Sequence, residues 1–236
     1  MNNKQFTWDF LMAKIHNPIG VAGLMGNLYA ESGINPINLQ NTGNTKLKLT
    51  DEEYTANVDH GKISKTGFCR DGYGYGIAQW TYRSRKEKLY DFCKNSGRGS
   101  IGNLESQLEF LYDELLHSYP SVLKTLTTTN DIRVASDWVL TKYERPANQS
   151  QSVRNKRAKY ALDIYDEFNK QRYVRINRHT VNVRKGPSTK YKTVGVVRYG
   201  QIFPFIDQDK ETGWYAIKYE GEVYWITNKY TSIVED

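Results

Sequence analysis

A single glutamate near the end of an apolar segment is the residue in this chain best suited to acid chemistry. Glu31 is the next-to-last residue of the stretch LMGNLYAES, and Leu28 lies about one helical turn before it. Apolar neighbours disfavour the charged form of a carboxyl group, so such a group tends to keep its proton. A protonated carboxyl group is what a glycoside hydrolase uses to protonate the leaving sugar oxygen. The alternative interpretation is an ordinary solvated glutamate near a helix end.

A second stretch with the means for chemistry is GYGIAQWT, residues 74–81. Two glycines surround Tyr75, and Gln79 and Trp80 follow within five positions. Amide groups and aromatic faces on one tight turn suit an N-acetylated sugar, whose C–H groups pack on a ring face. We therefore expect Tyr75, Gln79 and Trp80 to contact substrate. The alternative is a loop that packs its tryptophan into the core.

These side chains need rigid elements to position them, and the sequence predicts one helix that ends close to Glu31. Asn17 followed by Pro18 is a favourable helix start. Gly33 is a natural left-handed stop for the same helix. Small residues recur at every third position between them, so another backbone or a substrate could approach this face closely. These residues are Gly20, Gly23 and Gly26.

The two parts of the chain differ in their hydrophobic period. Up to about residue 172 the apolar residues recur at helical spacing, as they do at Leu104, Leu108, Leu111 and Leu115. Between residues 40 and 76 this pattern fails, and six glycines predict loops with a short hairpin. After residue 172 the period changes to two, which predicts five short strands and a small barrel. The strands are expected at residues 181–183, 194–196, 202–206, 214–217 and 223–226.

Three ordered motifs resemble the phage-tail-type lysozyme domain of the lysozyme-like superfamily. They are GVAGLMGNLYAESGINP, DGYGYGIAQWTYRSRK and WVLTKYERPA, and the resemblance covers about residues 5–170. It implies a helical fold that cleaves the β-1,4 bond between N-acetylmuramic acid and N-acetylglucosamine. In this resemblance Glu31 matches the catalytic acid. Gln79 matches a glutamine shared with goose-type lysozymes and lytic transglycosylases, and Tyr143 matches an active-site aromatic residue.

A later set of motifs resembles a bacterial SH3-like domain over about residues 174–234. The motifs are VNVRKGPSTKYKTVGVVRYG, GWYAI and GEVYWITNKY. Gly186 and Pro187 are expected to form a turn that Arg184 anchors. The resemblance implies non-catalytic binding to the peptide or cross-bridge of a bacterial cell wall. Aromatic residues that could contact the wall are Tyr191, Tyr199, Trp214 and Tyr224.

The second carboxylate of the expected active site is harder to choose. A retaining glycosidase places it about 5 Å from the acid, and an inverting one leaves about 6.5–9.5 Å for water. Asp51, Asp59 and Asp71 all lie in the segment predicted to be irregular, and Asp59 is the preferred candidate. The domain could also use no second carboxylate. Related lytic transglycosylases work with the glutamate alone and release 1,6-anhydro products.

The net charge of +7 draws the protein to polyanions, of which nucleic acid and an anionic cell wall are two. The basic residues are spread along both parts of the chain, which argues against the basic stripe of a nucleic-acid-binding protein. The densest basic run contains Arg154, Lys156, Arg157 and Lys159. It falls on a predicted helix, where a solvated face is the expected role.

The two cysteines leave thiol catalysis as an alternative chemistry. Cys69 could pair with His60, or Cys93 with His117, although neither cysteine has a recognisable peptidase motif. The chain has no C-x-x-C pair, and its histidines lack metal-ligand spacing. We therefore expect no metal and no cofactor.

Together these patterns predict an α+β protein of two domains. Residues 1–171 form a mainly α-helical, lysozyme-like catalytic domain, and residues 172–236 form a small all-β SH3-like barrel. The expected function is that of an endolysin, a peptidoglycan hydrolase held on the wall by its SH3-like domain; the alternative of another class is a non-catalytic wall-binding protein. The N-terminus lacks the apolar run of a secretory signal, and no stretch is long enough to span a membrane. Synthesis in the host cytoplasm is therefore expected, and the resemblance implies a holin-type release partner.

Overall fold

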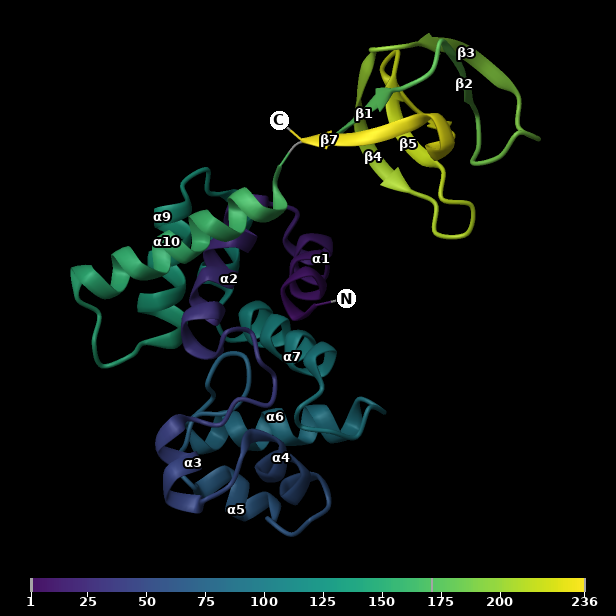
Figure 1. Ribbon diagram of the computed structural model, residues 1–236. Coiled ribbons are helices and arrows are strands. Elements are labelled where there is room, and N and C mark those ends of the chain that lie inside the picture. The colour runs from purple at the N-terminus through teal and green to yellow at the C-terminus, as the bar shows by residue number, and fades with distance from the viewer. Residues whose placement is uncertain (1, 171, 236) are drawn as a thin grey trace. The chain divides into compact units, whose positions relative to one another are not determined.

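The computed structural model describes residues 2–170 and 172–235, and the chain divides into two compact units, Met1–Phe168 and Asn169–Asp236 (Figure 1). Each unit has its own hydrophobic core. The first is helical and the second is a β-sheet, as the change of hydrophobic period predicts. The predicted domain boundary, between residues 171 and 172, touches Gln171, which lies outside the described residues.

The first unit is built around α2 (Pro18–Ser32) and α10 (Gln151–Phe168), which pack against each other. The other helices are α1 (Asn3–Ile15), α3 (Asn41–Leu47), α4 (Asp51–Asp59), α5 (Lys65–Arg70), α6 (Arg83–Asn95), α7 (Leu104–His117), α8 (Pro120–Thr128), α9 (Ile132–Trp138) and the π-helix η1 (Val139–Glu144). The predicted leucine stripe lies on α7, where Leu108, Leu111 and Leu115 are fully buried.

Helix α2 has the bounds that its end signals predict. The side chain of Asn17 accepts a hydrogen bond from the backbone N–H of Ile19, and Gly33 ends the helix with a positive φ of 65°. The small residues of α2 face other backbones: a Cβ atom on Gly20 would lie 1.8 Å from the carbonyl oxygen of Leu126, and one on Gly26 would lie 2.5 Å from the amide of Ala161. The glycine spacing therefore lets α8 and α10 approach α2, which confirms the prediction of close backbone contact.

The segment between residues 40 and 76 is helical rather than irregular, so the prediction of loops and a hairpin is wrong. It contains α3, α4 and α5. Helix α4 begins with a capping box, in which Thr50 and Glu53 each accept a hydrogen bond from the other's backbone N–H. Several glycines of the segment lie at helix ends or in turns, where they do not interrupt these short helices. Thr50 and Glu53 have the spacing of a capping box in the sequence, a local signal for this helix start that the prediction of loops did not use.

The second unit is one antiparallel sheet of seven strands within the described residues, in the order β3-β2-β6-β5-β4-β1-β7. The strands are β1 (Arg172–Ile176), β2 (Thr180–Arg184), β3 (Thr193–Arg198), β4 (Ile202–Gln208), β5 (Tyr215–Tyr219), β6 (Glu222–Ile226) and β7 (Thr231–Glu235). The five predicted strands are present. Strands β1 and β7, which pair with each other, were not predicted from the sequence.

The turn that follows β2 has the anchor that the sequence predicts. The Nη1 atom of Arg184 donates to the carbonyl oxygens of Thr189 and Tyr191, at 3.1 and 2.8 Å. A Cβ atom on Gly186 would lie 2.6 Å from the ring of Tyr191, so only glycine lets this ring pack on the turn.

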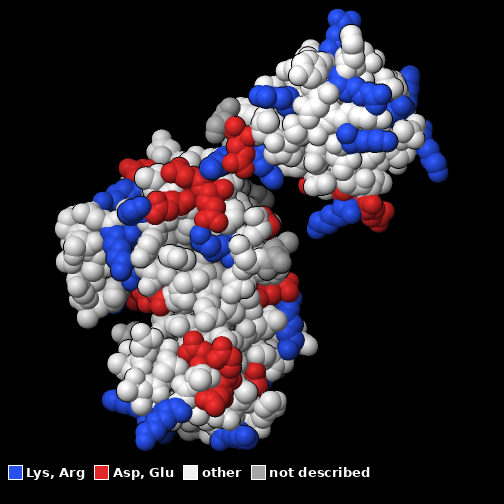
Figure 2. Space-filling view, in the orientation of Figure 1, with Lys and Arg blue, Asp and Glu red and all other residues white. Residues whose placement is uncertain are grey.

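Figure 2 shows one face of each unit. On the helical unit, patches of acidic side chains lie beside basic ones, whereas the charged side chains on the visible face of the sheet unit are mostly Lys and Arg. Among the described residues, no helix is both long enough and apolar enough to cross a membrane.

Candidate active site

A cavity of about 850 Å³ lies in the helical unit where the end of α2 meets two loops. Glu31 comes from α2, Gln79 from the glycine-rich loop, Arg85 from α6, and Glu144 and Arg145 from the end of η1. Of the described residues that line the cavity, Glu31 and Glu144 are the two acids. The structure therefore brings together two of the predicted site residues, Glu31 and Gln79, with an acid that was not predicted.

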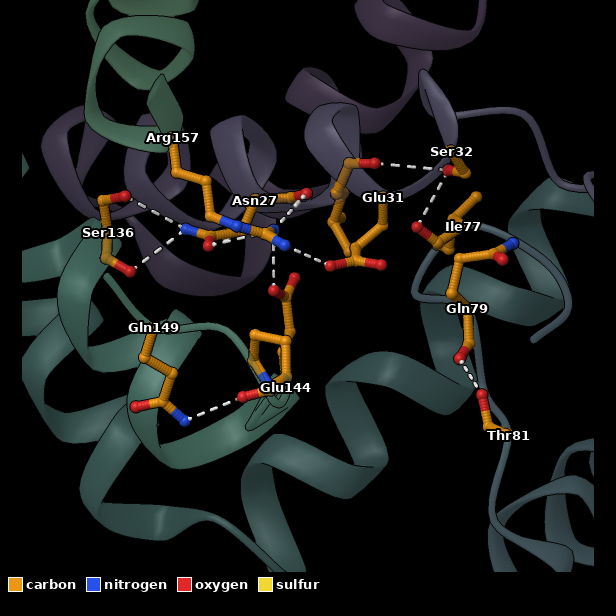
Figure 3. A network of polar contacts seen from close by, with 12 residues as sticks. Asn27, Glu31, Ser32, Ile77, Gln79, Thr81, Ser136, Glu144, Gln149 and Arg157 are labelled. Carbon is orange, nitrogen blue, oxygen red and sulfur yellow. Dashed lines mark hydrogen bonds and ion pairs between the residues drawn. The ribbon is translucent and has the colours of Figure 1, made fainter. Parts of the chain in front are cut away.

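The carboxyl groups of Glu31 and Glu144 bind the same guanidinium, that of Arg157 on α10 (Figure 3). The Nη2 atom of Arg157 donates to Oε1 of Glu31, and Nη1 donates to Oε2 of Glu144 at 2.7 Å. The side chain of Glu31 is 21% exposed, whereas those of Arg157 and Glu144 are 9% and 4% exposed. Glu31 is thus the member of this triad with most access to the cavity.

Buried polar groups hold Arg157 in place beneath the two acids. Its Nη1 atom also donates to the carbonyl and side-chain oxygens of Asn27, at 3.2 and 3.4 Å. The amide nitrogen of Asn27 donates in turn to the backbone oxygens of Gly23 and Ser136, at 2.8 and 3.1 Å. The position of the guanidinium is therefore fixed by α2, α9 and η1 together (Figure 3).

Glu144 has an unusual setting. Burial raises its pKa to about 8, against the opposing charge of Arg157 and with a further contribution from the charge and hydrogen bond of Glu31. No N–H or O–H of the described residues donates to its Oε1 atom, which is buried. Glu144 also ends a π-helix, a rare geometry that is frequent at functional sites, and the next residue, Arg145, has a positive φ of 52°.

Gln79 is held in a strained backbone conformation beside Glu31. Its φ is +48°, a value that residues other than glycine rarely adopt and that is often found at functional sites. Its Nε2 atom donates to both the carbonyl and side-chain oxygens of Asn38, at 3.1 and 2.9 Å, and to the carbonyl oxygen of Gly76 at 3.2 Å. The hydroxyl of Ser32 donates to the carbonyl oxygen of Ile77 at 2.9 Å, which ties this loop to the end of α2 (Figure 3).

The three predicted aromatic contacts lie behind the cavity wall rather than on it. Tyr75, Trp80 and Tyr143 are at most 1% exposed, and none of them lines the cavity. Trp80 and Tyr143 both donate to the carboxylate of Glu114 on α7, at 2.8 and 2.7 Å. Their placement favours a supporting role, because a fully buried ring offers no face to a sugar.

Glu114 joins the two segments that carry the cavity residues. Besides Trp80 and Tyr143, it binds Arg85 through two hydrogen bonds of 2.7 Å each. The guanidinium of Arg85 also lies 4.7 Å from the ring centre of Tyr143. One buried carboxylate therefore fixes the loop of Gln79, the end of η1 and a cavity arginine relative to one another.

The aspartates that were considered as a second carboxylate do not line the cavity. Asp59, the preferred candidate, accepts hydrogen bonds from Lys94, Ser100 and the backbone N–H of Ile101, at 2.8, 2.6 and 3.0 Å. Asp71 binds the buried Lys86 at 2.6 Å, and Asp51 accepts from the backbone N–H of Leu39. These carboxylates hold α4 and its neighbouring loops together. Asp59 therefore lies outside the cavity that contains Glu31.

Both cysteines are buried, which is unfavourable for a nucleophile. Cys69 and Cys93 are 2% and 0% exposed. Burial raises the pKa of both thiols, that of Cys93 to about 12, so the reactive thiolate is disfavoured. His117, one of the proposed partners, is exposed, and its Nδ1 atom lies 2.9 Å from the carboxylate of Asp113 on its own helix. Within the described residues, no group of three or more His, Cys, Asp or Glu side chains could hold a metal ion.

Three residues that line the cavity or bind its acids were not predicted, although the sequence contains a feature that points to each of them. Arg157 was assigned to a solvated face, yet it lies four residues before Ala161 and so continues the buried stripe of α10. Glu144 directly follows Tyr143 in the KYERP motif. Tyr82 lies two residues after Trp80; it lines the cavity and is 71% exposed.

Comparison with known families agrees with this architecture. Residues 2–168 match the family described as phage tail lysozyme, and residues 179–232 match the bacterial SH3 domain. The first match covers most of the chain and contains every residue of the cavity. The chain therefore belongs to the phage tail lysozyme family and carries a bacterial SH3 domain after its lysozyme-like domain.

Proposed function

We propose that this peptidoglycan-lytic enzyme cleaves the β-1,4 bond between N-acetylmuramic acid and N-acetylglucosamine, with Glu31 as the general acid. The observation that carries the proposal is the position of Glu31. Its carboxyl group reaches a cavity of about 850 Å³ from the end of a rigid, buried helix. The family membership supports a lysozyme-like, peptidoglycan-lytic activity.

The neighbours of Glu31 suit an N-acetylated sugar. Asn38 and Gly76 hold the amide nitrogen of Gln79, and no described residue donates a hydrogen bond to its Oε1 atom. This oxygen is therefore the group that would accept the N–H of an acetamido substituent. Tyr82, exposed at the cavity, would provide a ring face for a sugar.

In this proposal Glu31 donates its proton to the glycosidic oxygen, which leaves with the electron pair of the broken C1–O bond. The oxocarbenium-like carbon is then attacked by a hydroxyl group. If water attacks, the product has a reducing muramic acid end. If the muramic acid 6-hydroxyl attacks, the product is a 1,6-anhydro sugar.

The second outcome, lytic transglycosylase activity, is supported by one observation. The cavity acids among the described residues are Glu31 and Glu144, and both bind Arg157. A base for water must reach the opposite face of the sugar. Glu144 is 4% exposed and bound to Arg157, so it is poorly placed to activate water there.

Mass analysis of the soluble fragments from purified cell walls tests the bond and the product type together. Reducing N-acetylmuramic acid ends are the expected result, and 1,6-anhydro ends would assign the enzyme to the transglycosylases. Fragments with new reducing N-acetylglucosamine ends, or with only cleaved peptides, would contradict the proposed bond.

Tyr82→Ala is expected to weaken substrate use by about 3- to 10-fold, because an aromatic contact contributes about 0.5–1.5 kcal/mol. The effect should appear in KM on a soluble glycan oligomer rather than in kcat. Leu162→Ala removes an exposed apolar side chain of α10 outside the cavity and is the control. An unchanged KM for Tyr82→Ala would remove Tyr82 from the sugar site.

We further propose that the SH3 domain keeps the enzyme on the wall. The charged side chains on its visible face are mostly basic (Figure 2), which would favour binding to an anionic wall. A protein of residues 1–170, which contains the helical unit, is expected to remain largely in the supernatant when mixed with insoluble walls and centrifuged. The full chain should sediment. Equal sedimentation of the two proteins would show that the SH3 domain is not the anchor.

A further inference from the structure

The triad of Glu31, Arg157 and Glu144 contains more acid than base. Two carboxyl groups and one guanidinium meet where two of the three side chains are less than 10% exposed. If both acids were ionised, one negative charge would remain uncompensated in a poorly solvated place, which is costly. The triad becomes neutral if its two acids hold one proton between them.

Glu144 is the better place for that proton at rest. Its side chain is 4% exposed, against 21% for Glu31, so its charged form has lost more of its hydration. Its buried Oε1 atom receives no hydrogen bond from the described residues, which leaves this oxygen free to carry hydrogen. The pKa of Glu144, raised by burial to about 8, agrees with this geometry.

The charged groups that act on Glu144 come from three helices. Glu31 on α2 favours its neutral form, whereas Arg157 on α10 and Arg85 on α6 favour its charged form. Arg85 is itself bound in two places by Glu114, so its charge is largely compensated. Arg157 is therefore the cation whose charge the two acids compete for.

We propose that Glu31 and Glu144 share one proton, with Arg157 compensating the charge of whichever acid is ionised, and that Glu144 supplies this proton to Glu31 for catalysis. This inference rests on the proposed role of Glu31 as general acid. Glu144 is thus a positioning residue: it acts on the bond through Glu31.

In one catalytic cycle the two acids give up one proton and recover one. At rest Glu144 is protonated and Glu31 is ionised against Arg157. When substrate fills the cavity, the proton moves to Glu31, and Arg157 then compensates Glu144. Glu31 gives the proton to the leaving glycosidic oxygen, which keeps the electron pair of the broken bond. The attacking hydroxyl, from water or from the sugar itself, loses a proton as it bonds to C1, and that proton restores the pair.

The pH dependence of wall lysis by Glu144→Gln tests the inference. Glutamine cannot hold the shared proton, so in this variant Glu31 has no internal donor and must take its proton from solution. The alkaline limb of the activity profile should move to lower pH by at least about one unit, which is a tenfold loss at a fixed pH on that limb. The loss of activity should be smaller near pH 5 than on the alkaline limb, because solution then supplies the proton.

Two comparisons separate this effect from a structural one. Glu144→Asp keeps a carboxyl group and should retain most of the wild-type alkaline limb. Glu109→Gln removes an exposed acid that pairs with Arg98 outside the cavity, and should leave the profile unchanged. An alkaline limb for Glu144→Gln that coincides with that of wild type would overturn the inference.

A spectroscopic measurement on the wild-type protein keeps the inference testable if Glu144→Gln fails to fold. With ¹³C-labelled glutamate carboxyl groups, NMR at pH 6.5 should show one glutamate that remains protonated. A spectrum with every glutamate ionised at that pH would contradict the shared proton. Failure of the proposed function is distinguishable from failure of this inference, because Glu31→Gln would then keep its activity at every pH.

Discussion

Glu31→Gln is expected to lower the rate of cell-wall lysis by at least about 100-fold. Glutamine has nearly the same shape as glutamate but cannot donate a proton, and general acid catalysis contributes about 10²–10⁴-fold to such reactions. The change also replaces an acid that binds Arg157 by a neutral acceptor, so the fold is expected to persist. The measurement is the loss of turbidity of purified walls over time.

The matched control for this variant is Glu109→Gln, which makes the same chemical change on an exposed part of α7. Its lysis rate should equal that of wild type. Both variants should melt within a few degrees of the wild-type protein, so that a lost activity reports on chemistry. Wild-type lysis by a folded Glu31→Gln protein would mean that Glu31 is not the acid, and that another catalytic group, such as a thiol, must be considered again.

Glu114→Ala is expected to have the largest effect on stability, a loss of about 3–5 kcal/mol in the free energy of unfolding, because it leaves a buried charge without its partner. The carboxylate of Glu114 is 7% exposed and binds the guanidinium of Arg85. It also accepts hydrogen bonds from Trp80 and Tyr143. Urea unfolding measures the change. Where Glu114→Ala remains folded, its lysis rate should also fall, since both cavity segments lose their common anchor.

Glu87→Ala is the control for this prediction. Glu87 forms an ion pair with Arg83 on the surface of α6, where the two side chains are 38% and 56% exposed. Removing an exposed pair of this kind costs about 0–1 kcal/mol. If Glu114→Ala were no more destabilising than Glu87→Ala, the account of Glu114 as the support of the cavity would be wrong.

Much of the fold follows from local signals in the sequence. Asn17, Pro18 and Gly33 define the ends of α2 because capping depends on residues within a few positions of the helix end. The strands of the second unit follow from a period of two. Strands β1 and β7 were missed because each is stabilised by pairing with a distant segment, and their sequences, RYVRI and TSIVE, alternate only weakly.

The site was predicted less completely, because its chemistry depends on contacts between distant residues. Glu31 binds Arg157, which lies 126 positions away in the sequence, and no local pattern predicts that pairing. Glu114 likewise reaches Trp80 across 34 positions. The sequence motif locates the glycine-rich loop, but it does not show which of its rings faces the cavity. Trp80 points into the core, whereas Tyr82 is exposed at the cavity.

The most direct test of the account uses soluble glycan chains of alternating N-acetylglucosamine and N-acetylmuramic acid from which the peptides have been removed. On these chains neither amidase nor peptidase activity can contribute. New chain ends are counted by mass spectrometry. We expect wild type to cut at N-acetylmuramic acid, and Glu31→Gln to cut at least about 100-fold more slowly. Intact chains after incubation with wild type, or equal cutting by the two proteins, would contradict a glycan-cleaving enzyme that depends on Glu31.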